Sequence, residues 1–163
     1  SRGLGDVYKR QCIFSHKYPE AYITDGMFYQ AVHTGKGGDF AVDGILIIIN
    51  DTPVTTLTQA KELISAQKRF TANFLFVQAK TSATFDSGEM LKVGYGIKKF
   101  FTDKDICANQ EVKEFKLIAD YVFENSVNFV ENPTCSIYYV TTGKWTKDEF
   151  LIKLIEELSL IHI

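Results

Sequence analysis

Three polar side chains interrupt the most apolar segments of this sequence of 163 residues. Asp43 directly precedes an apolar run at residues 44–49, and Gln78 and Lys80 lie near the end of a strand-like stretch, residues 73–81. Because successive residues of a strand face opposite sides, Gln78 and Lys80 are expected on one face. A carboxylate and an ammonium at the mouth of one hydrophobic core must be paired, metal-bound or functional.

These residue types suit a divalent-metal phosphodiesterase site. Mg²⁺ (or Mn²⁺) prefers oxygen ligands, which the Asp43 carboxylate, the Gln78 side-chain oxygen and the Ala79 carbonyl would supply. Lys80 would orient the attacking water or help to deprotonate it, and would stabilise charge on the phosphate. The predicted catalytic residues are therefore Asp43, Gln78 and Lys80, and the predicted metal ligands are Asp43, Gln78 and Ala79. A structural ion pair of Asp43 and Lys80 without catalysis stays open as the alternative.

Strands that alternate with helices are expected to position these residues. Runs of β-branched and alternating apolar residues predict strands, and apolar residues three or four apart predict helices. The expected strands cover residues 40–50, 73–81 and 135–141, and the expected helices cover 57–66, 89–101 and 111–130, with a last helix opened by a capping box at 146–149. In the helix at 89–101, Leu91, Gly94, Ile97 and Phe101 are expected to form the packed stripe. Residues 50–53 are expected to end the first strand. This order predicts one α/β sandwich domain.

Composition excludes several classes of protein. The sequence is 45% hydrophobic and 23% charged, with 18 Lys and Arg against 20 Asp and Glu, which is typical of a soluble globular domain. No run of about 18 apolar residues occurs, so no membrane segment is predicted. Three widely spaced cysteines predict neither a zinc site nor a disulfide framework, and favour a reduced, intracellular setting. A small-molecule α/β enzyme lacks support, because no glycine-rich nucleotide loop and no nucleophile elbow is present.

The two ends of the sequence are expected to be foreign to the protein. Residues 158–163 back-translate to CTG TCT CTT ATA CAC ATC and residues 6–11 to GAT GTG TAT AAG AGA CAG, which are reverse complements that resemble the end of a transposase-type sequencing-library adaptor. We therefore expect residues 1–11 and 158–163 to be translated adaptor and residues 12–157 to be a single truncated domain. A chance match of native peptides is the alternative. Without the two ends the formal net charge changes from −2 to −4, because they contain three basic residues and one acidic residue.

Two segments carry a resemblance to a known superfamily. Residues 38–45, GDFAVDGI, followed by residues 76–82, FVQAKTS, resemble the D…(D/E/Q)xK core of the PD-(D/E)xK restriction-endonuclease-like superfamily in its Mrr-like form. The second segment, with Phe85 and GIKKFF at 96–101 downstream, is similar to the N-terminal region of AIPR proteins, the abortive-infection phage-resistance family. The resemblance covers residues 39–101, and the last strand more loosely. It implies an α/β fold with a restriction-endonuclease-like core, a mixed central β-sheet flanked by helices.

The resemblance also implies roles for individual residues. Asp43 takes the place of the metal-binding acid, Gln78 that of the residue that is usually Glu or Asp, and Lys80 that of the catalytic lysine. The implied activity is Mg²⁺- or Mn²⁺-dependent endonucleolytic cleavage of DNA in phage defence, in a prokaryotic cytoplasm, with no membrane association. RNA as substrate, a homodimer, and a missing C-terminal region of the same protein as partner stay open. The expected nucleic-acid contacts are Lys36, Lys92 and Lys99, with a solvated helix face as the alternative for the last two.

Two departures from the family pattern favour a second hypothesis. Gln78 is neutral, which leaves the site less negative charge for a metal, and an inserted helix separates it from Asp43. The net charge of −4 also argues against binding of nucleic acid, although local lysines can still bind phosphate. The alternative is therefore a catalytically inactive, nuclease-like module that binds or senses nucleic acid.

Overall fold

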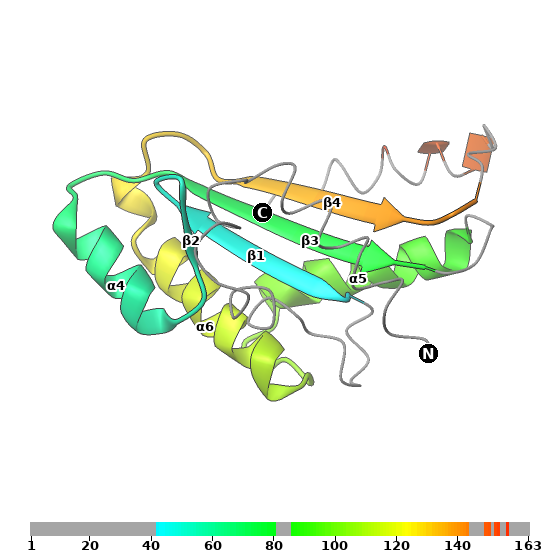
Figure 1. Cartoon of the computed structure of the whole chain (residues 1–163), viewed down its shortest axis with the longest axis horizontal. Helices are drawn as coiled ribbons and strands as arrows, with labels where there is room; N and C mark the ends of the chain where they lie inside the picture. The colour runs from blue at the N-terminus through cyan, green and yellow to red at the C-terminus, as the bar shows by residue number, and fades with distance from the viewer. Residues whose placement is uncertain (1–41, 81–85, 144–148, 151, 154–155, 157–163) are drawn as a thin grey trace.

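The computed structural model describes residues 42–80 and 86–143, together with 149–150, 152–153 and 156. Within these residues, four strands form one sheet in the order β2-β1-β3-β4 (Figure 1). The strands are β1 (Gly44–Ile49), β2 (Thr52–Val54), β3 (Ala72–Ala79) and β4 (Thr134–Val140). The helices are α4 (Leu57–Ala66), α5 (Ser87–Thr102), α6 (Gln110–Glu124) and the short 3-10 helix η1 (Ser126–Asn128).

The direction of the strands makes the sheet mixed. β1 is antiparallel to both β2 and β3, whereas β3 and β4 are parallel and are joined through α5 and α6. A parallel pair needs such a crossover, because a short turn can only reverse the chain. The predicted α/β class, with a mixed sheet flanked by helices, is confirmed at this level.

The apolar runs of β1 and β3 form the buried core, as the sequence predicts. Every side chain from Ile45 to Ile49 is fully buried, as expected for a central strand that is covered on both faces. On β3, Phe76 packs edge-to-face against Phe100 of α5, with ring centroids 5.3 Å apart. Phe74 stacks on Phe123 of α6 at 5.7 Å. These contacts hold α5 and α6 against one face of β3, and strand alternation places Gln78 and Lys80 on the same face.

The sequence pattern did not predict the hairpin that follows β1, where the strand was expected only to end. Asn50 and Asp51 have φ angles of 48° and 62°, the left-handed values that a two-residue hairpin turn requires. The chain therefore reverses after Ile49, and β2 pairs with β1. Pro53 is tolerated in β2 because this strand lies at the edge of the described sheet. Asn and Asp adopt φ above 0° more readily than other non-glycine residues, which is the clue that the sequence contained.

The expected helices agree with the structure in position, with two corrections. α4 covers the predicted residues, and α5 extends two residues before and one after its predicted range. α6 ends at Glu124 rather than at residue 130, because the chain tightens into η1. Leu91 was expected in the packed stripe of α5 but is 45% exposed; the buried stripe instead contains Met90, Val93, Gly94, Ile97 and Phe100. The capping box expected at 146–149 lies, apart from Glu149, outside the described residues.

No helix in the described part of the chain is both long and apolar enough to cross a membrane.

Candidate functional site

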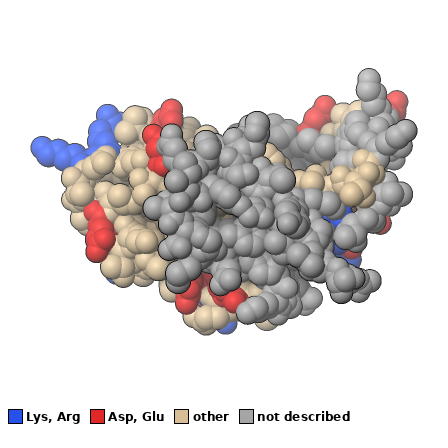
Figure 2. All heavy atoms as spheres, viewed as in Figure 1, with Lys and Arg blue, Asp and Glu red and all other residues tan. Residues whose placement is uncertain are grey.

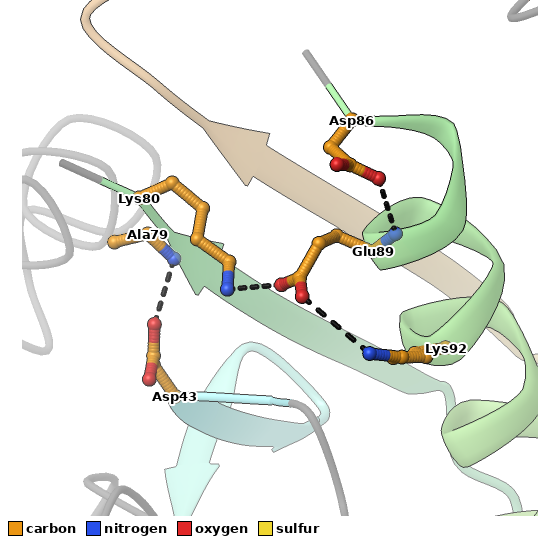
Figure 3. Close-up of polar contacts among 6 residues, drawn as sticks. All are labelled: Asp43, Ala79, Lys80, Asp86, Glu89 and Lys92. Atoms are coloured by element: carbon orange, nitrogen blue, oxygen red, sulfur yellow. Dashed lines mark hydrogen bonds and ion pairs between the residues drawn. The ribbon is translucent and has the colours of Figure 1, made fainter. Parts of the chain in front are cut away.

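Asp43 is fixed to the end of β3, although 36 residues separate it from its partner there. Its Oδ2 atom accepts a hydrogen bond from the backbone N–H of Ala79 at 2.8 Å (Figure 3). Its own backbone N–H donates to the carbonyl of Val77 at 2.9 Å. The antiparallel pairing of β1 with β3 reaches Gly44, which lies opposite Val77, and Asp43 directly precedes it. The pairing of β1 with β3 thus brings Asp43 to the level of the predicted site on β3.

Gln78 is a buried polar residue whose side-chain oxygen accepts no hydrogen bond in the described structure. The residue is only 7% exposed, and among the residues that the structure describes its Oε1 atom has no hydrogen-bond partner. A buried acceptor without a partner costs about 1–3 kcal/mol, so native folds rarely keep one without a reason. The Gln78 oxygen is therefore suited to bind a cation or a water molecule.

Lys80 forms an ion pair with Glu89, a residue that the sequence did not single out for a role in the site. Lys80 directly follows β3 and Glu89 lies in the first turn of α5 (Figure 3). The second carboxylate oxygen of Glu89 lies 3.6 Å from the Nζ atom of Lys92. Asp86, the N-cap of α5, accepts a hydrogen bond from the Glu89 backbone N–H at 3.0 Å. The N-cap Asp86 marks where α5 begins, but the contact of Glu89 with Lys80 depends on how α5 packs on β3.

The ion pair with Glu89 stabilises the charged form of Lys80. The hydrogen bond with Glu89 raises the pKa of Lys80; burial opposes this effect, and electrostatic interactions with Glu89, Tyr139 and Asp43 add to it. The same hydrogen bond lowers the pKa of the Glu89 carboxyl. Lys80 is therefore a cation at neutral pH, which suits it to stabilise negative charge and to orient a water molecule. It does not suit Lys80 to accept a proton.

The predicted metal ligands fit a hard cation in chemical type. The Ala79 N–H donates to Asp43, which places the backbone of Ala79 next to the carboxylate. Gln78 adds its unpartnered oxygen. Within the described ranges, however, no three His, Cys, Asp or Glu side chains group in a way that could hold a metal ion. The ligand set of Asp43, Gln78 and Ala79 would thus contain a single carboxylate.

Of the three lysines expected to contact phosphate, the structure describes Lys92 and Lys99. Lys92 has a side chain that is 71% exposed beside Glu89, and Lys99 lies seven residues further along α5 with its Nζ atom 5.0 Å from the ring centroid of Tyr95. A spacing of seven puts Lys92 and Lys99 on one face of the helix. Lys36 lies outside the described residues. On the face drawn in Figure 2, the basic and acidic side chains of the described residues form small separate groups and no broad positive surface.

A hollow of about 650 Å³ lies near the other end of α5. Its lining comes from the end of α5, the following loop and α6: Phe101, Thr102, Lys104, Lys116, Asp120, Phe123 and Glu124. Lys116 is 6% exposed there and forms an ion pair with Asp120. None of the predicted site residues lines this hollow. The candidate site is therefore the Asp43, Gln78 and Lys80 end of the sheet, extended by Glu89.

Comparisons of the chain with protein-family models, with curated proteins and with solved structures return no match.

Proposed function

We propose that this chain is a metal-dependent endonuclease domain that hydrolyses DNA phosphodiester bonds, with Asp43, Gln78 and Lys80 as its catalytic residues. The observation that supports the proposal is the hydrogen bond that brings Asp43 to Ala79, the residue between Gln78 and Lys80 in the chain. Gln78 is buried with an unpartnered oxygen in the described structure, and Lys80 is a cation. A role in phage defence, a prokaryotic cytoplasmic setting and a homodimer belong to the same proposal and rest on the resemblance to AIPR proteins.

Each residue has a distinct role in the proposed reaction. Asp43, Gln78 and the Ala79 carbonyl would hold Mg²⁺ or Mn²⁺, which when bound polarises the phosphate and lowers the pKa of a bound water. Lys80 places a fixed positive charge where negative charge develops on the phosphate. Lys92 and Lys99 would bind flanking phosphates from α5.

The test is cleavage of supercoiled plasmid by the full chain with Mg²⁺, Mn²⁺ or EDTA. We expect nicking only with metal, and its loss in Asp43→Ala and Lys80→Ala with the circular dichroism spectrum retained. Asp105→Ala and Lys113→Ala remove one charge of each sign from exposed positions and serve as matched controls that keep activity. Cleavage that survives in EDTA, or in both site variants, would contradict the proposal.

A second candidate function is supported by two observations at the site. The described site has a single carboxylate among the proposed ligands, and the ion pair with Glu89 partly neutralises Lys80. Such a site fits a catalytically inactive module that binds or senses nucleic acid. Fluorescence anisotropy with duplex DNA, single-stranded DNA and RNA in EDTA separates the two hypotheses. Tight binding without cleavage under either metal would favour the inactive module.

A further inference from the structure

We propose that Glu89 is a positioning residue of this site, whose carboxylate holds the Lys80 ammonium in place at the end of β3. The inference rests on the proposed nuclease function, and it adds a residue on α5 to a site otherwise carried by the sheet. No motif in the sequence assigns Glu89 a role.

The two partners are attached to elements that cannot easily move apart. The Lys80 backbone N–H donates to the Val140 carbonyl at 2.7 Å, which ties Lys80 to β4. Glu89 lies in the first turn of α5, whose buried face includes Met90, Val93 and Phe100 packed into the core. The ion pair therefore joins the end of β3 to α5 through two residues whose backbones are fixed. It differs in this from a pair between two mobile side chains on the surface.

Glu89 is held in place both at its backbone and at its carboxylate. The Asp86 side chain accepts from the Glu89 backbone N–H at 3.0 Å and so fixes the first turn of the helix. Lys92 lies 3.6 Å from one carboxylate oxygen, while Lys80 binds the other oxygen. The side chains of Lys80 and Glu89 are 30% and 35% exposed, so both are partly accessible to solvent. The anchored backbones at both ends, more than burial, keep the two charged groups together.

This arrangement limits the flexibility of Lys80. A lysine side chain has a flexible four-carbon stem, and its ammonium samples many positions unless a partner holds it in one. Glu89 holds it at the end of β3, next to the residues proposed to bind the metal.

The test measures Lys80 directly and does not depend on nuclease activity. The order of the Lys80 side chain is followed by NMR relaxation of its ¹³Cε group in the full chain labelled with ¹³C-lysine, in EDTA, with its resonance assigned by its loss in Lys80→Arg. Glu89→Gln removes the charge but keeps an acceptor, and Glu89→Asp keeps the charge with a shorter reach. Glu111→Gln is the matched control, because it removes a carboxylate from the first turn of another helix, α6.

We expect the order of the Lys80 side chain to fall in Glu89→Gln, to recover in part in Glu89→Asp, and to stay unchanged in Glu111→Gln. The rate of plasmid cleavage at saturating Mg²⁺ should fall roughly 10- to 100-fold in Glu89→Gln, as expected when a charged group is misplaced. Unchanged order of the Lys80 side chain, or full cleavage by Glu89→Gln, would overturn the inference. If the wild type cleaves nothing while the order of the Lys80 side chain responds to Glu89, the ion pair stands and the nuclease proposal has failed.

Discussion

The Asp43 carboxylate accepts a hydrogen bond from the backbone N–H of Ala79 at 2.8 Å, which joins the start of β1 to the end of β3. The contact gives Asp43 a structural role beside the proposed catalytic one, because it satisfies a backbone donor at the end of the ladder. Variants of Asp43 must therefore separate the loss of this hydrogen bond from the loss of charge.

Asp43→Asn is expected to separate the two roles. The asparagine oxygen can still accept from the Ala79 N–H, so the free energy of unfolding should change little, whereas Asp43→Ala should lose about 1 kcal/mol. Both variants remove the carboxylate from the proposed ligand set, so cleavage at fixed Mg²⁺ should fall about 100-fold or more in each. Urea denaturation and plasmid nicking on the same samples test this. Full activity in Asp43→Asn would remove Asp43 from the proposed metal ligands.

Changes at Gln78 should move stability and metal binding in opposite directions. Gln78→Leu removes a buried oxygen that has no partner in the described structure, so the unfolding free energy should stay equal or rise by up to about 1 kcal/mol while metal binding is lost. Gln78→Glu buries a carboxylate, which should cost about 1–3 kcal/mol without metal.

With metal, Gln78→Glu supplies the second acid that the site lacks. We expect Mn²⁺ to bind about tenfold more tightly than in the wild type, because affinity follows the number of charged ligands. Isothermal titration with Mn²⁺, and urea denaturation with and without it, measure both effects. Equal Mn²⁺ affinity in wild type, Gln78→Leu and Gln78→Glu would show that no metal site exists at Gln78.

The ion pair of Lys80 and Glu89 predicts a defined dependence of stability on pH. Folding lowers the pKa of Glu89 from its ordinary 4.5, so its contribution is present above that value and is lost as the pH falls through the folded pKa. Folding raises the pKa of Lys80 above its ordinary 10.5, so its contribution is present below that value and is lost as the pH rises through the folded pKa. Between these limits the pair should stabilise the fold.

The measurement is the free energy of unfolding of the wild type and of the double variant Lys80→Met/Glu89→Gln from pH 3 to pH 11. The difference between them should be largest from about pH 5 to pH 10 and should shrink at both extremes. A difference that does not vary with pH would show that the pair contributes no charge-dependent stability.

Lys116 and Asp120 provide a prediction about stability away from the candidate site. The Lys116 side chain is 7% exposed and Asp120 is its ion-pair partner, so Asp120→Ala leaves a buried ammonium without that carboxylate. We expect Asp120→Ala to cost about 1–3 kcal/mol and the double variant Lys116→Met/Asp120→Ala to cost less, because methionine needs no partner. Lys113→Met, on the exposed side of α6, is the control and should stay within about 0.5 kcal/mol of wild type. A double variant less stable than Asp120→Ala would refute this account.

Lys92 and Lys99 should contribute to binding of nucleic acid through phosphate. Each substitution to alanine is expected to weaken DNA binding without regard to sequence, and to reduce the slope of log affinity against log salt by about 1. Lys113→Ala should leave the slope unchanged. Anisotropy titrations at several NaCl concentrations, in EDTA, give these slopes. Unchanged slopes in both variants would make this face of α5 a solvated surface.

Local sequence pattern was sufficient to place most of the elements that hold the site. The run of β-branched residues at 45–49 needs burial on both faces, and it forms the central strand β1. The alternation in β3 placed Phe74, Phe76, Gln78 and Lys80 on one face, and the contacts of the two phenylalanines and of Lys80 with α5 and α6 confirm this for all but Gln78. Successive side chains of a strand point to opposite faces, which is a local property of the chain. The sequence alone therefore determines which residues share a face.

Other features depended on the packing of distant segments. The hairpin to β2 was missed because its turn uses left-handed Asn50 and Asp51 in place of glycine. Leu91 was assigned to the wrong side of α5 because the apolar residues of this helix fit two adjacent stripes, and contact with β3 selects the stripe of Met90 and Phe100.

Within the site, the sequence by itself determined which residue types were available: one acid, one amide and one lysine in apolar strands. The tertiary structure decided their partners. The register of β1 on β3 brought Asp43 to the Ala79 N–H, and the packing of α5 brought Glu89 to Lys80. A hydrogen bond or an ion pair needs two groups within a few ångströms of each other. The number of residues between two groups does not determine that distance when loops and other elements lie between them.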